Sequence, residues 1–71
     1  VKIFPNPAMG TLYIESPFAV RAIITGADGK IAAEQFNAST MNISMLPPGA
    51  YIISIYDDSG GLLTVQKIIK E

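Results

Sequence analysis

The chain has 71 residues, enough for one domain, and a domain of this size buries only about 60% of the surface that its unfolded chain exposes. Its five basic and six acidic residues are scattered and give a net charge of −1, which argues against nucleic acid and lipid as partners. Although 49% of the residues are hydrophobic, no apolar run approaches the roughly 20 residues of a membrane-spanning helix.

The first elements are predicted to be short strands separated by proline turns. Residues 1–4 are expected to be extended and to stop at Pro5, Asn6 and Pro7, because each proline fixes its own φ and biases the preceding residue away from helix. Residues 8–10 complete the turn. Residues 11–15 alternate and predict a strand that buries Leu12 and Ile14.

A hairpin is predicted next. Residues 19–25 place Val20, Ala22 and Ile24 on one apolar face, although Ile23 lies on the other. The turn at residues 26–29 contains an Asp-Gly pair, which suits the positive φ values of tight hairpins, so residues 30–36 should pair back. Helix is the alternative for residues 30–36, because they include good helix formers, but seven uncapped residues seldom hold a helix.

The middle of the chain is predicted to be a polar turn and a further strand. The turn covers residues 37–40, and the strand covers residues 41–45 with Met41, Ile43 and Met45 pointing inward.

Residues 46–56 carry the strongest structural signal. Leu46, Pro47, Pro48 and Gly49 predict a corner, and residues 50–56 predict a central strand with one wholly apolar face. A tyrosine just inside that strand, Tyr51, is typical of the tyrosine corner of immunoglobulin-like sandwiches, in which the phenol hydroxyl bonds to upstream backbone.

The last hairpin turns at residues 57–61 and leads into a strand over residues 62–70, with Leu63 and Val65 on one face. Adjacent Ile68 and Ile69 break the alternation and predict a bulge, or a strand covered on both faces. About seven strands at roughly ten-residue spacing predict an all-β fold, a small immunoglobulin-like antiparallel β-sandwich.

The residue types argue against an enzyme. There is no His and no Cys, which removes the usual general base, thiolate nucleophile and metal ligands, and the lysines are expected at solvated strand ends or turns. We therefore expect no catalytic residue, no cofactor and no small-molecule substrate. The acidic turn at residues 57–60 admits a calcium loop as an alternative, but a solvated hairpin turn is favoured.

Two further patterns are weak. Asn37 and Asn42 each begin a triplet that fits N-glycosylation, a pattern short enough to arise by chance. Tyr13 and Tyr56 are expected to be exposed; they suit a sugar-stacking platform, but cross-strand pairs are favoured.

Four blocks in order resemble the type A C-terminal sorting domain of the Bacteroidetes type IX (Por) secretion system. They are Phe4-Pro5-Asn6-Pro7-Ala8 with Gly10 and the Leu12-x-Ile14 strand, Gly29-Lys30, Ile43-x-x-Leu46-Pro47-x-Gly49-x-Tyr51, and Lys67-Ile68-Ile69-Lys70. Together they span almost the whole chain. One departure is Gly26, where the family usually has an acidic residue, and Asp28 is expected to take over its role in the turn.

The resemblance implies a secretion signal domain that catalyses no reaction. Residues 1–71 are expected to be a single C-terminal sorting domain, a fragment of a larger secreted protein whose cargo lies N-terminal to it. Such domains fold in the periplasm after Sec export and are recognised by the outer-membrane type IX translocon. A sortase-like peptidase then usually cuts upstream of the domain, and the cargo is secreted or held at the cell surface.

Two surfaces are hypothesised to contact the translocon. One is the edge of the final strand at Lys67, Ile68, Ile69 and Lys70, where free backbone groups would pair and the lysines would discourage self-association. The other is the stiff turn Pro5, Asn6 and Pro7. Deleting residues 67–71 is expected to abolish delivery and leave most of the fold. A further set is expected to define the fold instead: Gly10, Gly29, Leu46, Pro47, Gly49 and Tyr51.

Two other classes of function remain open. A carbohydrate-binding or adhesive module would use Tyr13, Tyr56 and the acidic turn. A structural spacer of the fibronectin type III kind would lie inside a chain and usually carries a core Trp, which is missing. Whether the parent protein stops at Glu71 separates a sorting domain from a spacer.

Overall fold

The computed structural model describes residues 1–37 and 39–71, and these residues form seven strands. No helix in these ranges is long and apolar enough to cross a membrane. The strands, in chain order, are β1 (Lys2–Phe4), β2 (Thr11–Glu15), β3 (Arg21–Gly26), β4 (Ile31–Gln35), β5 (Thr40–Asn42), β6 (Gly49–Tyr56) and β7 (Leu62–Lys70).

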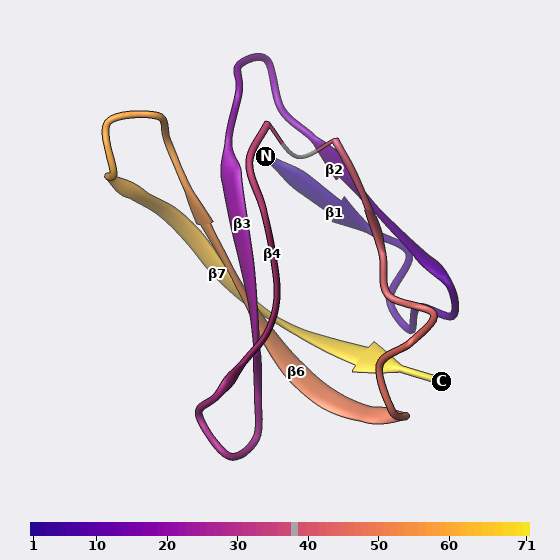
Figure 1. The fold of residues 1–71 in the computed structure, drawn as a ribbon. Coiled ribbons are helices and arrows are strands. Elements are labelled where there is room, and N and C mark those ends of the chain that lie inside the picture. Colours follow the sequence, from indigo (N-terminus) through magenta and orange to yellow (C-terminus); the bar gives the residue numbers. More distant parts are fainter. Residues whose placement is uncertain (38) are drawn as a thin grey trace.

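The strands form two antiparallel sheets within the described residues, packed as a β-sandwich (Figure 1). One sheet has the order β1-β2-β5 and the other the order β4-β3-β6-β7. These orders correspond to strands A-B-E and C′-C-F-G of an immunoglobulin-like sandwich. The predicted fold class is therefore confirmed.

β6 is an inner strand of the larger sheet, as predicted, since it pairs with β3 on one side and β7 on the other. Tyr51, Ile53 and Ile55 are buried on its inner face, whereas Ile52 on the opposite face is exposed. Successive residues of β6 thus point to opposite faces of the sheet, as the alternation in the sequence predicts.

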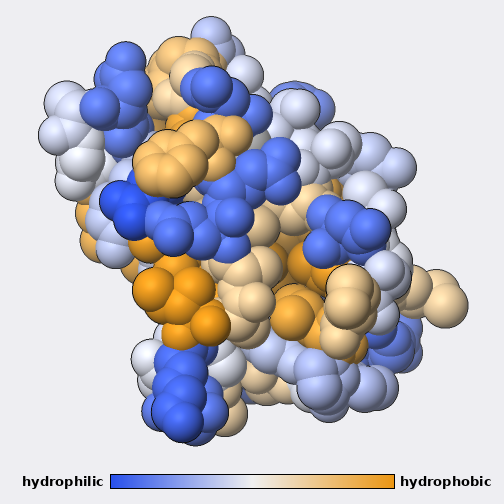
Figure 2. Space-filling model, viewed as in Figure 1, coloured by the Kyte–Doolittle hydropathy of each residue, from blue (hydrophilic) through white to orange (hydrophobic). Residues whose placement is uncertain are grey.

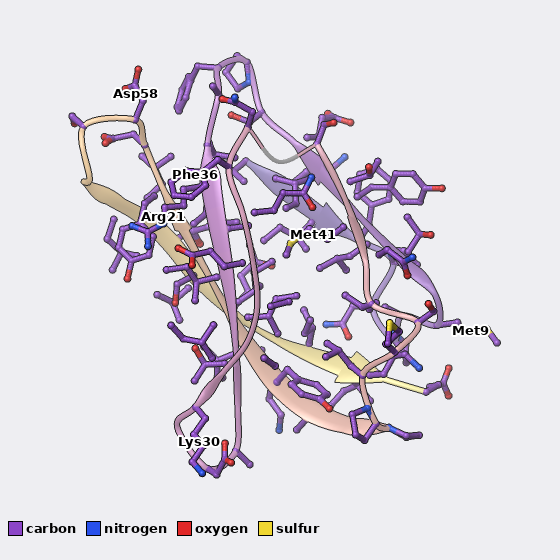
Figure 3. All side chains as sticks on the ribbon, viewed as in Figure 1. Met9, Arg21, Lys30, Phe36, Met41 and Asp58 are labelled. Atoms are coloured by element: carbon purple, nitrogen blue, oxygen red, sulfur yellow. The ribbon has the colours of Figure 1, made fainter. Side chains whose placement is uncertain are left out.

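The core lies between the two sheets. It comprises mostly aliphatic residues from both sheets and from the segments beside them: Ala8, Leu12, Ile14, Val20, Ala22, Ile24, Met41, Ile43, Tyr51, Ile53, Ile55 and Ile68. Figure 3 shows the side chain of Met41 pointing into the space between the sheets, whereas Met9 projects into solvent. Figure 2 shows hydrophobic and hydrophilic residues interspersed on the outside of one face. The predicted inward residues of residues 11–15 and 19–25 are confirmed.

The predicted tyrosine corner is present. The Tyr51 hydroxyl donates a hydrogen bond of 2.6 Å to the Pro47 carbonyl oxygen, four residues upstream. Gly49, between them, has φ of 153°, a positive value that disfavours a side chain. The corner thus ties the start of β6 to the segment that leads into it.

The predicted strand in residues 30–36 is confirmed over the helix alternative, because these residues contain β4, whose backbone groups find partners in β3. Two expectations need correction. Met45 is 93% exposed and not inward, because β5 ends at Asn42 and the chain turns through a hydrogen bond from the Leu46 amide to the Ile43 carbonyl. The break in β7 lies at Leu63, where the register with β6 shifts, and pairing is regular through Ile68 and Ile69.

Candidate functional site

The two predicted recognition segments lie side by side. The Asn6 side chain donates from Nδ2 to the Lys67 carbonyl oxygen at 3.1 Å and accepts at Oδ1 from the Ile69 amide at 3.0 Å. The side-chain amide therefore takes the place of a strand residue beside β7. Sequence reasoning treated the two segments as separate candidates, and tertiary structure joins them.

Ala8 extends this contact along β7. Its amide donates to the Ile69 carbonyl oxygen at 2.7 Å, and its carbonyl oxygen accepts from the Glu71 amide at 2.8 Å. Ala8 runs parallel to Lys70 in this bridge and is completely buried. Residues 5–8, called the strap below, thus cover the end of the β7 edge, which means that Ala8 is more than the turn residue that the sequence indicated.

Asn6 is suited to this role because of its neighbours. Pro5 and Pro7 have no amide hydrogen, so the strap backbone cannot donate at either position. Both proline peptide bonds are cis. The asparagine side chain supplies a donor and an acceptor where the prolines cannot, and an Asn between two prolines is the sequence signal that could have indicated the contact.

The strap contradicts part of the edge hypothesis. β7 does lie at the edge of its sheet, as predicted. However, the outward groups at its end already have partners: the Lys67 carbonyl, both backbone groups of Ile69 and the Glu71 amide. A translocon strand cannot pair with this part of the edge unless the strap leaves.

The four residues of the final block also differ from one another in exposure. Lys67 is exposed, but Ile68 is 1% exposed and Lys70 only 8% exposed. The Lys70 ammonium donates to the Glu71 carbonyl oxygen at 2.9 Å, within a part-buried environment. The expectation that both lysines are solvated is wrong for Lys70, because even-numbered residues of β7 face the core. Lys67 is the residue of this block that presents a charge freely.

Residues expected to define the fold occupy turns and their flanks. Gly29 has φ of 84° in the β3–β4 hairpin, and the Asp28 carboxylate accepts from the Lys30 amide at 3.0 Å, so Asp28 does shape the turn beside Gly26. Gly10 has a negative φ, and its carbonyl oxygen accepts from the Ile43 amide at 2.9 Å. Leu46 is partly buried against the core.

The acidic turn is organised by one carboxylate. Asp57 Oδ1 accepts hydrogen bonds from the Ser59 amide at 3.0 Å, the Ser59 hydroxyl at 2.7 Å and the Gly61 amide at 2.7 Å. These bonds, the one from the Ser59 side chain foremost, hold the pKa of Asp57 below its usual value. In the described ranges no group of three His, Cys, Asp or Glu residues is placed to hold a metal ion. The arrangement supports the hairpin interpretation, in which the carboxylate is the acceptor for the turn.

The structure does not support the proposed tyrosine platform, and the side chain of one candidate glycosylation residue, Asn42, is already hydrogen-bonded. Tyr13 on β2 stacks on Phe4 of β1, with ring centroids 5.6 Å apart, as the cross-strand alternative predicts. Tyr56 belongs to the other sheet, so Tyr13 and Tyr56 form no common platform. Asn42 Oδ1 accepts from the Ser44 amide at 3.0 Å, and the triplet at Asn37 includes Ala38, which lies outside the described residues.

Comparison with models of known protein families gives a match over almost the whole chain. The family model described as "Secretion system C-terminal sorting domain" matches residues 2–71, almost the whole chain. A comparison with curated proteins finds no match. The family match covers both the strap and the end of β7, the two segments that the fold brings together.

Proposed function

Because the chain belongs to the family of secretion system C-terminal sorting domains, we propose that it directs an attached cargo through the outer-membrane type IX translocon. Membership makes the chain a type IX secretion sorting signal, carried by a secreted or cell-surface protein. The family is not an enzyme family. The cargo is expected N-terminal to residues 1–71, which act as a single C-terminal domain.

The proposed route has three steps. The parent protein enters the periplasm, where residues 1–71 fold as the sandwich described above. The translocon then recognises the folded surface and passes the cargo across the outer membrane. Finally, a sortase-like peptidase cuts upstream of the domain, and the cargo is released or attached to the cell surface.

The observation that supports this proposal is the joint between the strap and the end of β7. Asn6 and Lys67 are 61 residues apart in sequence, yet the Asn6 side chain bonds directly to the Lys67 backbone. A receptor that meets the folded domain therefore meets one surface, formed by Pro5, Pro7 and Lys67, and not two linear motifs. Such a surface is already ordered, which lowers the entropy cost of binding.

The test is a fusion of residues 1–71 behind a Sec signal and a fluorescent protein in a Bacteroidetes host. We expect fluorescence in the medium or on the cell surface, and a cargo trimmed of the domain. The matched control is the same fusion without residues 1–71, which should stay in the periplasm. Equal retention of both fusions in the periplasm would point to a structural spacer and contradict the sorting function.

A further inference from the structure

We propose that an uncovered part of the β7 edge, residues 63–67, binds an extended strand of the secretion machinery by β-strand addition. This inference rests on the proposed function and names the mode of recognition and the kind of partner. It shifts the pairing site away from the end of β7, which the strap already fills. Residues 63–67 are called the open edge below.

The direction of the backbone groups defines the open edge. Ile69 gives its amide to Asn6 and its carbonyl oxygen to Ala8, so both groups point away from β6. In an antiparallel ladder, outward residues alternate with residues that bond the partner strand. Because the register with β6 is regular from residue 64 to residue 70, Lys67 and Val65 also direct their backbone groups outward.

The open edge has a boundary at each end. At one end, the Asn6 side chain already donates a hydrogen bond to the Lys67 carbonyl oxygen. At the other end, the register shift at Leu63 bends the strand. Between them lie the Val65 amide and carbonyl and the Lys67 amide. An incoming strand would therefore be limited to this length, and the strap would set its register.

The side chains beside the open edge indicate what the incoming strand carries. Val65 is 51% exposed and Leu63 39% exposed, and Ile52, which pairs with Lys67 on the same outer face, is 39% exposed. In strand addition, main-chain hydrogen bonds between the edge and the incoming strand supply the affinity. The side chains of alternate residues of the incoming strand supply the specificity. The matching strand would have apolar residues against Val65 and Leu63 and a carboxylate against the Lys67 ammonium.

A second copy of this chain is a poorer occupant. Two open edges could pair only over residues 63–67, because the strap blocks the rest of β7 in each copy. A contact of that length is too small for the roughly 1,200 Å² that stable protein interfaces bury. It suits a larger membrane partner that adds contacts elsewhere and releases the domain after export.

The test compares two proline substitutions at opposite edges of one sheet. Val65→Pro removes an outward amide and places a ring on the open edge, while the ladder with β6 keeps its hydrogen bonds. Glu34→Pro makes the same change on β4. The Gly26 amide bonds the Lys30 carbonyl, so alternate residues of β3 face β4, and Ile23 lies between two of them. Glu34 pairs with Ile23, beyond the register shift in β4, and therefore directs its backbone groups outward. Glu34→Pro also loses an exposed ion pair with Arg21, which contributes little.

Both variants are made in the fluorescent fusion described above. We expect Val65→Pro to lower extracellular fluorescence at least about tenfold, as the loss of one or two hydrogen bonds in a binding step predicts, with Glu34→Pro close to the unsubstituted fusion. Protease resistance of the domain in the purified fusions checks that both variants fold. Full delivery of a folded Val65→Pro variant, or equal loss in both variants, would overturn the proposal.

Further measurements keep the test decisive. If Val65→Pro fails to fold, Lys67→Pro removes the other free amide of the open edge, and full delivery of that folded variant would equally contradict strand addition. Val65→Lys keeps every backbone group, and its full delivery would contradict the apolar match proposed for Val65. Sedimentation of the unsubstituted fusion tests the second copy: a dimer that Val65→Pro dissociates would assign the open edge to self-association instead. Failure of the unsubstituted fusion to leave the periplasm would instead refute the sorting function itself.

Discussion

Single polar contacts fix the turns of this small domain. The Tyr51 hydroxyl holds the Pro47 carbonyl, the Asp57 carboxylate holds the tip of the last hairpin, and the Asn6 amide holds the strap. A chain of 71 residues has a total stability on the order of 4–11 kcal/mol at typical values per residue. One such bond is thus a sizeable fraction of the whole.

Tyr51→Phe tests the corner at this scale. The substitution keeps the buried ring and removes the hydroxyl, which leaves the Pro47 carbonyl without its 2.6 Å partner. We expect a loss of about 1 kcal/mol in the free energy of unfolding, measured by urea denaturation. Tyr13→Phe, at an exposed ring, is the matched control and should change stability much less. Equal effects of the two substitutions would contradict a structural role for the corner.

Asp57 gives the last hairpin a pH dependence. Its pKa is lowered in the folded state, so the charged carboxylate stabilises the turn above the ordinary aspartate pKa of about 4, and this contribution is lost as pH falls through the lowered value. We expect the Ser59 and Gly61 amides to lose hydrogen-exchange protection below about pH 4 relative to amides of β6. Asp57→Asn keeps an acceptor that does not titrate, and in this variant the pH dependence should disappear.

At the scale of elements, β7 combines two roles that are hard to separate by deletion. Its outer edge carries the strap contacts and the open edge, while Ile68 and Lys70 on its inner face are buried. The earlier expectation that residues 67–71 can be removed with most of the fold intact therefore fails on structural grounds. Point substitutions on the outward residues test recognition, and deletions test stability.

The deletion of residues 67–71 is predicted to unfold the domain or leave it barely stable. It removes a fully buried isoleucine that pairs with Tyr51, together with the partners of Asn6 and Ala8. Ile68→Ala alone should cost roughly 2–5 kcal/mol, because truncation of a buried side chain leaves a cavity. Lys67→Ala, at an exposed position, should leave the urea midpoint within experimental error. A deletion variant with a native-like urea midpoint would refute this account.

At the scale of the whole molecule, the two sheets share one core. Leu12 and Met41 come from the sheet that contains β2, and Ile24, Ile53 and Ile68 come from the other. Neither sheet has a second layer on its outer face in the described ranges, so each needs the other to bury its apolar side. The domain should therefore unfold as one cooperative unit.

Leu12→Ala tests this cooperativity. We expect a loss of roughly 2–5 kcal/mol, with coincident urea transitions by circular dichroism and by tyrosine fluorescence. Tyr13 lies in the same sheet as the substitution, and Tyr51 and Tyr56 lie in the other, so the fluorescence samples both. A two-step transition in either probe would indicate sheets that unfold independently.

The sequence by itself determined the local features of this protein. Alternation of apolar residues placed Leu12, Ile24 and Ile53 inside, because successive strand residues face opposite sides of a sheet. The prolines set turns because each fixes its own φ, and Gly29, Gly49 and Gly60 set turns because they adopt positive φ values that disfavour a side chain. The family resemblance, confirmed over residues 2–71, came from the order and spacing of the same residues.

Only tertiary structure decided which distant segments meet. Alternation of apolar residues does not indicate whether the outward backbone groups of an edge strand have partners. The partners of β7, Asn6 and Ala8, lie more than 60 residues away in sequence and contact it through a side chain and one bridge. For the same reason the alternation could not separate buried Lys70 from exposed Lys67, or place Met45 in solvent after β5 ends early. The alternation of apolar residues in the sequence specifies which face of a strand each side chain lies on. The packing of distant segments specifies which groups contact that strand.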